Sequence, residues 1–147
     1  MSPESVDRIL IAETDFAIRK QLHRRLLDAN LFSDCVADGG SALSLLCEKR
    51  YAVIILDLSL VYPGGNHSGS ERILEYVEQM PRAERPVVVF LADAGSARSL
   101  DVEVVQIVMR KPCNLIHLAD LIKSCVRTAA LHRESQEPMR PERFSGH

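Results

Sequence analysis

The sequence predicts an α/β domain built around a parallel β-sheet. Short apolar runs alternate along the chain with stretches in which apolar residues recur every three or four positions, and this alternation is typical of successive strand–helix–strand units. The 147 residues are 46% hydrophobic and 26% charged, which suits one packed core and leaves no room for a second domain of ordinary size. We therefore expect one domain with five strands and five helices.

The first half of the chain accounts for three of these strands. Arg8–Ala12 is apolar enough to be a buried strand, and between residues 18 and 26 every fourth residue is Ile or Leu, which gives a helix with one apolar stripe. Asp34–Ala37 is short and more polar, which suits a strand at the edge of the sheet. Apolar residues over 42–46 mark a second helix, and Tyr51–Leu56 follows as a strand buried on both faces.

A long, turn-rich connection follows the third strand. Residues Leu58–Gly69 contain one proline and three glycines, so we expect a surface loop. Ser68 and Glu71 have the spacing of a capping box, in which two side chains bond each other's backbone N–H groups at the start of a helix. Apolar residues between 73 and 80 then predict a third helix.

Two further strands and two helices complete the domain. Val87–Leu91 is apolar and rich in β-branched residues, and Val104–Met109 forms the last strand. Between them, Asp93–Glu103 has few large apolar residues, so a helix there is expected to be short or frayed. Asn114 is placed to cap a final helix whose apolar residues lie between 115 and 125.

The end of the chain differs in composition from the rest. Residues 129–147 lose the helical period and carry Pro138, Pro141 and Gly146 among balanced charges, so they cannot form a core. We predict a domain over residues 7–128 and a mobile tail over residues 129–147.

Charge and composition argue against several classes of protein. A formal net charge of −2 and a pI near 6.2 argue against nucleic acid or an anionic membrane as the partner. No apolar stretch approaches the roughly 20 residues that cross a bilayer, and Met1–Asp7 lacks the features of an export signal, so we expect a cytoplasmic protein. We also expect a monomer or a weak dimer.

The cysteines form no Cys-x-x-Cys pair, so we interpret them as core or surface residues. They are Cys35, Cys47, Cys113 and Cys125.

Acidic residues and one lysine stand where the predicted strands end. Glu13–Asp15 follows the first strand, Asp57 the third, Asp93 the fourth and Lys111 the fifth. Because ligands of an open parallel sheet gather outside the carboxyl ends of its strands, we expect these side chains to converge. Carboxylates crowded at one edge repel each other unless a cation neutralises them, and oxygen ligands favour Mg²⁺. A bound metal would also neutralise an incoming phosphoryl group.

Four segments together resemble the receiver domain of two-component response regulators. They are, in chain order, ILIAETD, VADGGSAL, VIILDLSL and VMRKP. Each is weak alone, but their order and spacing match the family from Arg8 to about Arg127. The resemblance implies a flavodoxin-like (CheY-like) three-layer sandwich, with a five-stranded parallel sheet in the order 2-1-3-4-5.

The same resemblance assigns roles to individual residues. Asp57 matches the aspartate that accepts a phosphoryl group from a histidine kinase or a histidine phosphotransfer protein. Glu13 matches the first acidic metal ligand, and Ser59 the residue whose backbone carbonyl completes the shell of Mg²⁺. Lys111 matches the lysine that pairs with the bound phosphoryl group, and Pro112 the cis proline that helps to aim it.

Several positions depart from the family pattern. Thr14 replaces the second acidic metal ligand, which predicts a weakened Mg²⁺ site; Asp15 either substitutes for it or caps the first helix, and the cap is favoured. Leu91 replaces the Thr or Ser that binds the phosphoryl oxygen, and Val108 replaces an aromatic switch residue. The connection Leu58–Gly69 is also longer than in the family.

Structural roles remain open for the same residues. Asp57 could cap a neighbouring loop, Lys111 could be its structural ion-pair partner, and Glu13–Asp15 could serve only to cap the first helix. The basic run between Arg19 and Arg25 is interpreted as the solvated face of that helix, although in receivers this helix commonly faces the kinase or phosphotransfer partner.

Two functions fit this pattern about equally, and neither is an enzyme. The first is a single-domain response regulator that accepts a phosphoryl group on Asp57 and signals by docking to a downstream protein. The second is a degenerate receiver that works as a protein-interaction module without phosphorylation, as Thr14, Leu91 and Val108 suggest. A third function, hydrolysis through an aspartyl phosphate, needs a second Asp two residues after the nucleophile, and Ser59 occupies that place.

Overall fold

The computed structural model describes four stretches of the chain. They are residues 8–57, 69–92, 106–110 and 114–136. The long connection after Asp57, the helix expected over Asp93–Glu103 and the capping residue Ser68 lie outside the described residues.

Five strands form one parallel sheet in the order β2-β1-β3-β4-β5, which confirms the predicted class and order. The strands are β1 (Ile9–Ala12), β2 (Ser33–Val36), β3 (Val53–Asp57), β4 (Val87–Ala92) and β5 (Gln106–Arg110). β1 and β3 are buried throughout, whereas β2 at the edge is largely half-buried, as its polar composition predicted. The register pairs Ala12 with Leu56 and Asp57 with Leu91, so the carboxyl ends of β1, β3 and β4 lie side by side.

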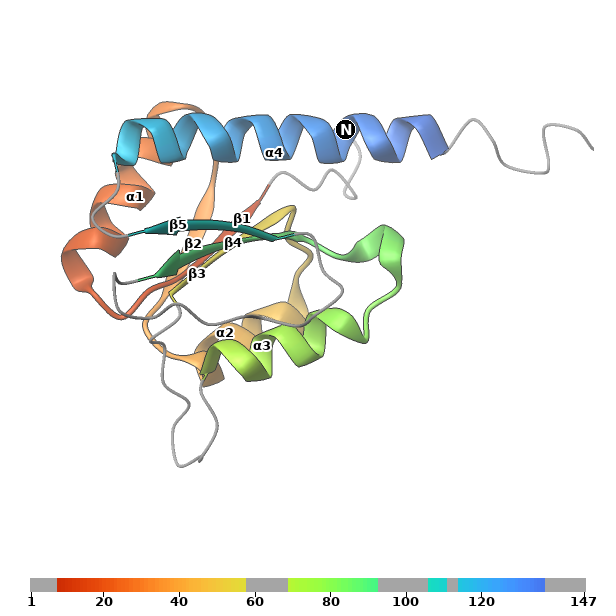
Figure 1. Ribbon diagram of the computed structural model, residues 1–147, viewed down its shortest axis with the longest axis horizontal. Helices are drawn as coiled ribbons and strands as arrows, with labels where there is room; N and C mark the ends of the chain where they lie inside the picture. The colour runs from red at the N-terminus through yellow and green to blue at the C-terminus, as the bar shows by residue number, and fades with distance from the viewer. Residues whose placement is uncertain (1–7, 58–68, 93–105, 111–113, 137–147) are drawn as a thin grey trace, which may run out of the picture.

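Helices cover both faces of the sheet and give the three layers that the resemblance implied (Figure 1). They are α1 (Phe16–Asp28), α2 (Gly39–Glu48), α3 (Gly69–Glu78), the short 3₁₀ helix η1 (Arg82–Glu84) and α4 (Leu115–Gln136). α1 and α4 lie on one face, and α2 and α3 on the other (Figure 1).

The starts of α2 and α3 approach each other at the backbone. A Cβ atom built on Gly39 would lie 2.7 Å from the Cα atom of Gly69, which is too close for any side chain at residue 39. Both helices begin near the edge where the strands end, so this glycine contact fixes two helix N-termini beside that edge.

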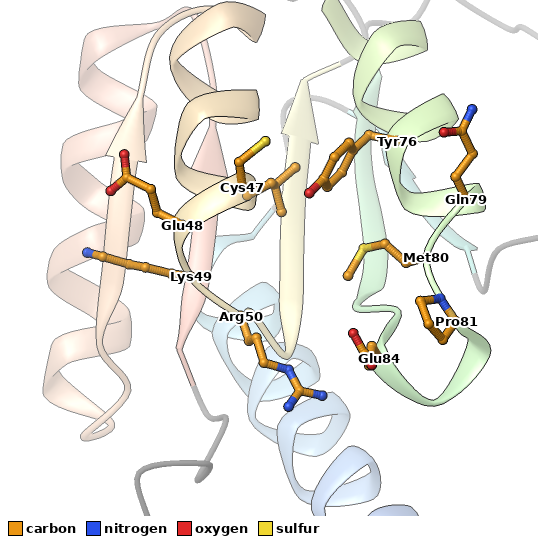
Figure 2. A pocket seen from close by; sticks show the side chains of 10 residues that line it. Cys47, Glu48, Lys49, Arg50, Tyr76, Gln79, Met80, Pro81 and Glu84 are labelled. Atoms are coloured by element: carbon orange, nitrogen blue, oxygen red, sulfur yellow. The ribbon is translucent and has the colours of Figure 1, made fainter.

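A cavity of about 450 Å³ lies at the opposite ends of the same two helices (Figure 2). Its walls come from the end of α2, the end of α3 and η1, and they include Lys49, Glu84 and Met80. A hydrogen bond between the Tyr76 hydroxyl and Cys47 raises the pKa of Tyr76. Because the walls mix both signs of charge with apolar surface, they favour no single class of ligand.

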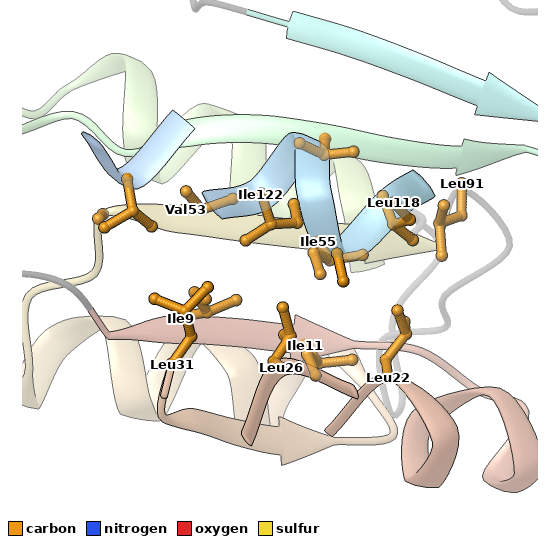
Figure 3. Packing of buried hydrophobic residues seen from close by; sticks show 14 residues of the cluster. Ile9, Ile11, Leu22, Leu26, Leu31, Val53, Ile55, Leu91, Leu118 and Ile122 are labelled. Carbon is orange, nitrogen blue, oxygen red and sulfur yellow. The ribbon is translucent and has the colours of Figure 1, made fainter. Parts of the chain in front are cut away.

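The face covered by α1 and α4 holds a continuous apolar cluster (Figure 3). Alternate residues of β1, β3 and β4 point into it, as the pleat of a sheet requires. Ile9 and Ile11 enter from β1 and Leu91 from β4, while α4 contributes Leu118 and Ile122. The residues in between, such as Leu10 and Phe90, fill the second cluster under α2 and α3.

Both ends of α1 have clear local causes. The Asp15 side chain accepts a hydrogen bond from the backbone N–H of Ile18 at 3.1 Å, which caps the N-terminus. Asn30 has a φ of 64°, the left-handed conformation that ends many helices. The N–H groups of Leu31 and Asn30 then donate to the carbonyls of Leu26 and Leu27, both at 2.9 Å, which completes a Schellman motif.

The last helix begins as predicted but ends later. The Asn114 side chain accepts hydrogen bonds from the N–H groups of Ile116 and His117 at 2.9 and 3.2 Å, which confirms the predicted cap. α4 runs on to Gln136, so the prediction that the helix ends before the tail of residues 129–147 is wrong. The segment 129–136 lacks glycine and proline and contains strong helix formers, so nothing in it stops the helix.

An ion cluster ties the edge of the sheet together at its amino end. The Asp34 carboxylate accepts a hydrogen bond from the Tyr51 hydroxyl at 2.6 Å and lies 3.3 Å from Arg8 and 3.4 Å from Lys49. Burial alone would raise the pKa of Asp34, but the Tyr51 hydrogen bond and the two cations outweigh it and lower that pKa. Burial and the bond to Asp34 raise the pKa of Tyr51.

Of the helices in the part of the chain that the structure describes, none combines the length and the apolar character of a membrane span. Three cysteines fall within the same residues, and all are free thiols: Cys35 and Cys47 are exposed, and Cys125 is half-buried. Burial raises the pKa of the Cys35 and Cys125 thiols. Cys113 lies outside the described residues.

Candidate functional site

Two carboxylates are buried where the central strands end. Glu13 follows β1 and is 0% exposed, and Asp57 ends β3 and is 1% exposed. They come directly after Ala12 and Leu56, which are partners in the β1–β3 ladder. Both residues were predicted at this edge, and the fold brings them to the ends of neighbouring strands. A carboxylate is almost never buried this deeply without hydrogen-bond or charge partners.

Thr14 supplies two of the partners of Asp57. Its hydroxyl donates to Oδ2 of Asp57 at 2.6 Å, and its backbone N–H donates to the same oxygen at 3.2 Å. The distance of the first bond is typical of a strong hydrogen bond between a hydroxyl and a charged carboxylate. The residue that replaces an acidic position of the family is therefore a hydrogen-bond donor to Asp57.

The turn that carries Thr14 is held from both sides. The backbone N–H of Asp15 donates to Oε2 of Glu13 at 2.9 Å. The guanidinium of Arg19 donates to the backbone carbonyls of Glu13 and Thr14 at 2.8 and 3.1 Å. These bonds fix the backbone between β1 and α1, and with it the amide of Thr14 that faces Asp57.

Arg19 was not singled out from the sequence, where it belonged to a solvated basic face. Helical side chains lean toward the N-terminus, so an arginine in the first turn of α1 can reach the carbonyls that precede the helix. The sequence feature that could have indicated this contact is the position of Arg19, four residues after the capping residue Asp15. The Arg19 guanidinium also lies 5.5 Å from the ring centre of Phe16, and Lys20 lies 5.9 Å from it.

Asp15 takes the role that the sequence analysis favoured. Its side chain caps α1 through Ile18, as described above. Its alternative role as a metal ligand in place of Thr14 stays a prediction. One oxygen of this carboxylate, Oδ1, is already used at the helix start.

Leu91 and Val108, which the resemblance places at switch positions, lie in different surroundings. Leu91 pairs with Asp57 across β3 and β4, is 0% exposed and belongs to the cluster under α1 and α4. Val108 on β5 is 57% exposed. The side chain of Leu91 therefore offers no hydrogen-bond donor at the position that pairs with Asp57 on the neighbouring strand.

Three predicted site residues belong to other parts of the chain. Ser59, Lys111 and Pro112 lie outside the residues that the structure describes. Their roles as metal-shell carbonyl, phosphoryl contact and cis proline stay predictions. The cavity between α2 and α3 is formed by a different set of residues and lies at the other end of the sheet.

Comparison with solved structures identifies the architecture around this site. A signal receiver domain of a putative Luxo repressor protein from Vibrio parahaemolyticus matches with a TM-score of 0.70 and 20% identity, over 88% of this chain and 97% of that chain. A CheY-like response regulator receiver domain protein from Methanospirillum hungatei JF-1 matches with a TM-score of 0.71 and 19% identity, over 86% and 98% of the two chains.

The fold is that of a receiver domain. A response regulator receiver protein from Burkholderia phymatum also matches, with a TM-score of 0.65 and 17% identity over 81% of this chain and 94% of that chain. The sequence matches no protein-family model and no curated protein. At these identities the likeness shows the receiver fold and assigns no role to an individual residue.

The resemblance to receiver domains implies a divalent cation, and the described residues supply only part of a site for one. Glu13 and Asp57 offer the carboxylate oxygens that Mg²⁺ prefers, on two neighbouring strand ends. Among the described residues, however, no group of three or more His, Cys, Asp and Glu side chains could hold a metal ion. The hydroxyl of Thr14 is directed at Asp57 in place of a third carboxylate.

Proposed function

We propose that this chain is the receiver of a response regulator in two-component or phosphorelay signalling. Asp57 accepts a phosphoryl group from a phosphohistidine on a kinase or a phosphotransfer protein, and the chain then signals by docking to a downstream protein. The observation that carries this proposal is the Asp57 carboxylate, buried at the carboxyl end of the central strand of a receiver fold and hydrogen-bonded to Thr14.

The chemistry is a direct displacement at phosphorus. A carboxylate oxygen of Asp57 attacks the phosphorus atom, an O–P bond forms, and the P–N bond to the histidine breaks. The imidazole nitrogen leaves with the electron pair and takes a proton from solvent. The two hydrogen bonds from Thr14 fall on Oδ2 and hold the carboxylate in place for this attack.

A divalent cation, when bound by Glu13 and Asp57, would supply charge neutralisation for the incoming phosphoryl group. Within the protein, the N–H of Thr14 and the brace from Arg19 keep the Asp57 carboxylate in one orientation. Lys111, as the family resemblance implies, would pair with the phosphoryl group after transfer.

The start of α1 offers a surface for the phosphodonor protein. Phe16 is 66% exposed at the first position of α1, next to the turn that contacts Asp57, and Arg19 and Lys20 lie over its ring. Aromatic residues, including Phe, and arginine are enriched in the buried cores of protein interfaces. A partner with an apolar, acidic face would complement this surface.

A second candidate function is a degenerate receiver that binds its partner without phosphorylation. The buried, donor-free side chain of Leu91 beside Asp57 and the exposed Val108 favour it, because the usual switch residues are missing. Under this alternative, the phosphodonor leaves the protein unmodified while the docking surfaces still bind the partner.

Intact-mass spectrometry separates the two functions. The chain and its Asp57→Asn variant are incubated with Mg²⁺ and acetyl phosphate, and separately with a phosphorylated histidine kinase. The proposal predicts one phosphoryl adduct on the unmodified chain and none on the variant. An unchanged mass under both conditions would contradict phosphorylation and favour the second function, and an equal adduct on the variant would place the modification elsewhere.

A further inference from the structure

We propose that Thr14 acts as a positioning residue that opposes the binding of a divalent cation at Asp57, because its hydroxyl occupies Oδ2, one of the two carboxylate oxygens open to a cation. This inference rests on the proposed function, in which Asp57 is a metal-assisted phosphoacceptor. It goes further because it makes Thr14 an active competitor of the cation rather than only a missing acidic ligand.

Oδ2 of Asp57 has a limited number of directions from which a donor or a cation can bind. A carboxylate oxygen has two lone pairs. On Oδ2 of Asp57, one is used by the backbone N–H of Thr14 at 3.2 Å and the other by its hydroxyl at 2.6 Å. A cation that binds Oδ2 therefore has to displace one of these donors.

The two Thr14 donors, its backbone N–H and its hydroxyl, differ in how easily they can move away from Asp57. The N–H of Thr14 belongs to a turn that is braced by Arg19 through the carbonyls of Glu13 and Thr14. The hydroxyl lies on an exposed side chain that turns about a single bond. When a cation binds Oδ2, the hydroxyl is therefore the donor that is displaced. The loss of its hydrogen bond to Asp57 opposes metal binding.

Competition by the Thr14 hydroxyl and the mere lack of an acidic ligand at residue 14 predict different effects on metal binding. If Thr14 only fails to supply a charge, its hydroxyl has no effect on metal binding or acts as a weak ligand, and removing it leaves affinity unchanged or lowers it. If the hydroxyl competes with the cation, removing it raises affinity. The two cases predict opposite directions for the same variant.

Titration of Mg²⁺ into the full chain by isothermal calorimetry tests the direction. Thr14→Val keeps the branched shape and removes the hydroxyl, and we expect Mg²⁺ to bind it roughly three- to tenfold more tightly, since a hydrogen bond to a charged group is lost from the competing state. Thr14→Ser keeps the hydroxyl and is expected to bind within about twofold of the parent chain. Thr14→Val combined with Asp57→Asn is expected to lose the gain.

A trace of Mn²⁺ locates the ion. In ¹H–¹⁵N spectra, paramagnetic broadening should reach the amides of Asp57 and Asp15 at a lower Mn²⁺ concentration in Thr14→Val than in the parent chain. Since residue 14 is exposed, both single variants are expected to fold, and thermal unfolding by circular dichroism checks this. Parent-like Mg²⁺ binding by Thr14→Ser would tie the gain in Thr14→Val to the hydroxyl, because a general packing effect would also change binding by Thr14→Ser.

Equal or weaker Mg²⁺ binding by Thr14→Val overturns the proposal, and so does the absence of binding in every variant. A gain that persists with Asp57→Asn also overturns it, because the ion then binds elsewhere. No phosphodonor is present in the titration, so the proposed function is tested separately. A chain that shows the Thr14→Val gain but never forms a phosphoryl adduct would refute the phosphoacceptor role and retain the competition.

Discussion

Replacing Leu91 by Thr tests whether the missing hydroxyl limits phosphorylation, and the structure supplies a matched control. Leu91 is fully buried and pairs with Asp57 across the β3–β4 ladder. Thr and Val have the same branched shape, so Leu91→Thr and Leu91→Val differ only by a hydroxyl in place of a methyl group. We expect more phosphoryl adduct on Leu91→Thr than on Leu91→Val under the same acetyl phosphate and Mg²⁺ conditions, because only Thr can donate to the phosphoryl oxygen.

The cost in stability can be estimated from the surroundings of Leu91. Leu91→Val removes about one methylene from a packed cluster, which is worth about 1 kcal/mol. Leu91→Thr adds the burial of a hydroxyl, about 1–3 kcal/mol when the hydroxyl lacks a partner. Urea unfolding should therefore place Leu91→Thr about 2–4 kcal/mol below the parent chain. An adduct yield on Leu91→Thr no greater than on Leu91→Val would refute the reasoning.

Three further predictions concern stability. Asn30→Gly should stabilise by about 0.5–1 kcal/mol in urea unfolding, because glycine adopts the left-handed conformation without a Cβ penalty; a loss of stability would contradict this. Gly39→Ala should destabilise by more than about 1 kcal/mol, since its Cβ would meet the Gly69 backbone, and an unchanged midpoint would count against that contact. Asp34→Asn should cost about 1–2 kcal/mol at pH 7 through the weakened Tyr51 bond, and the exposed Asp120→Asn is the control. Because folding lowers the pKa of Asp34, its contribution is present above the pKa of the unfolded chain and is lost as the pH falls through the lower folded pKa; a difference that grew in acid would refute the assignment.

Much of the fold could be predicted because burial leaves a regular trace in the sequence. β1 and β3 have apolar residues on both faces, and α1 repeats its apolar residues every four positions, so each segment is compatible with one kind of element. The caps at Asp15 and Asn114 were also visible, since short polar side chains before an apolar repeat are typical of helix starts.

Features that depend on distant contacts or on weak local signals could not be predicted in the same way. The approach of Gly39 to Gly69 joins two helices through their backbones, and no pattern near either glycine indicates it. The end of α4 at Gln136 was missed because apolar period was used as the criterion, whereas helix propensity alone carries the helix through residues 129–136. The bond from Thr14 to Asp57 depends on the turn between β1 and α1, which the brace from Arg19 shapes.

The Thr14–Asp57 pair also lowers the cost of burying a carboxylate at the acidic edge. A fully buried carboxylate costs several kcal/mol unless it is paired or hydrogen-bonded, and Asp57 is only 1% exposed. An acidic residue at position 14 would add repulsion at this edge and make the folded state depend on a bound cation. With threonine, the same position satisfies part of the hydrogen-bonding need of Asp57 from within the chain. The threonine that we propose to oppose metal binding therefore stabilises the fold when no metal is bound. Replacing it by Thr14→Asp should lower the melting temperature in chelator, and added Mg²⁺ should restore it.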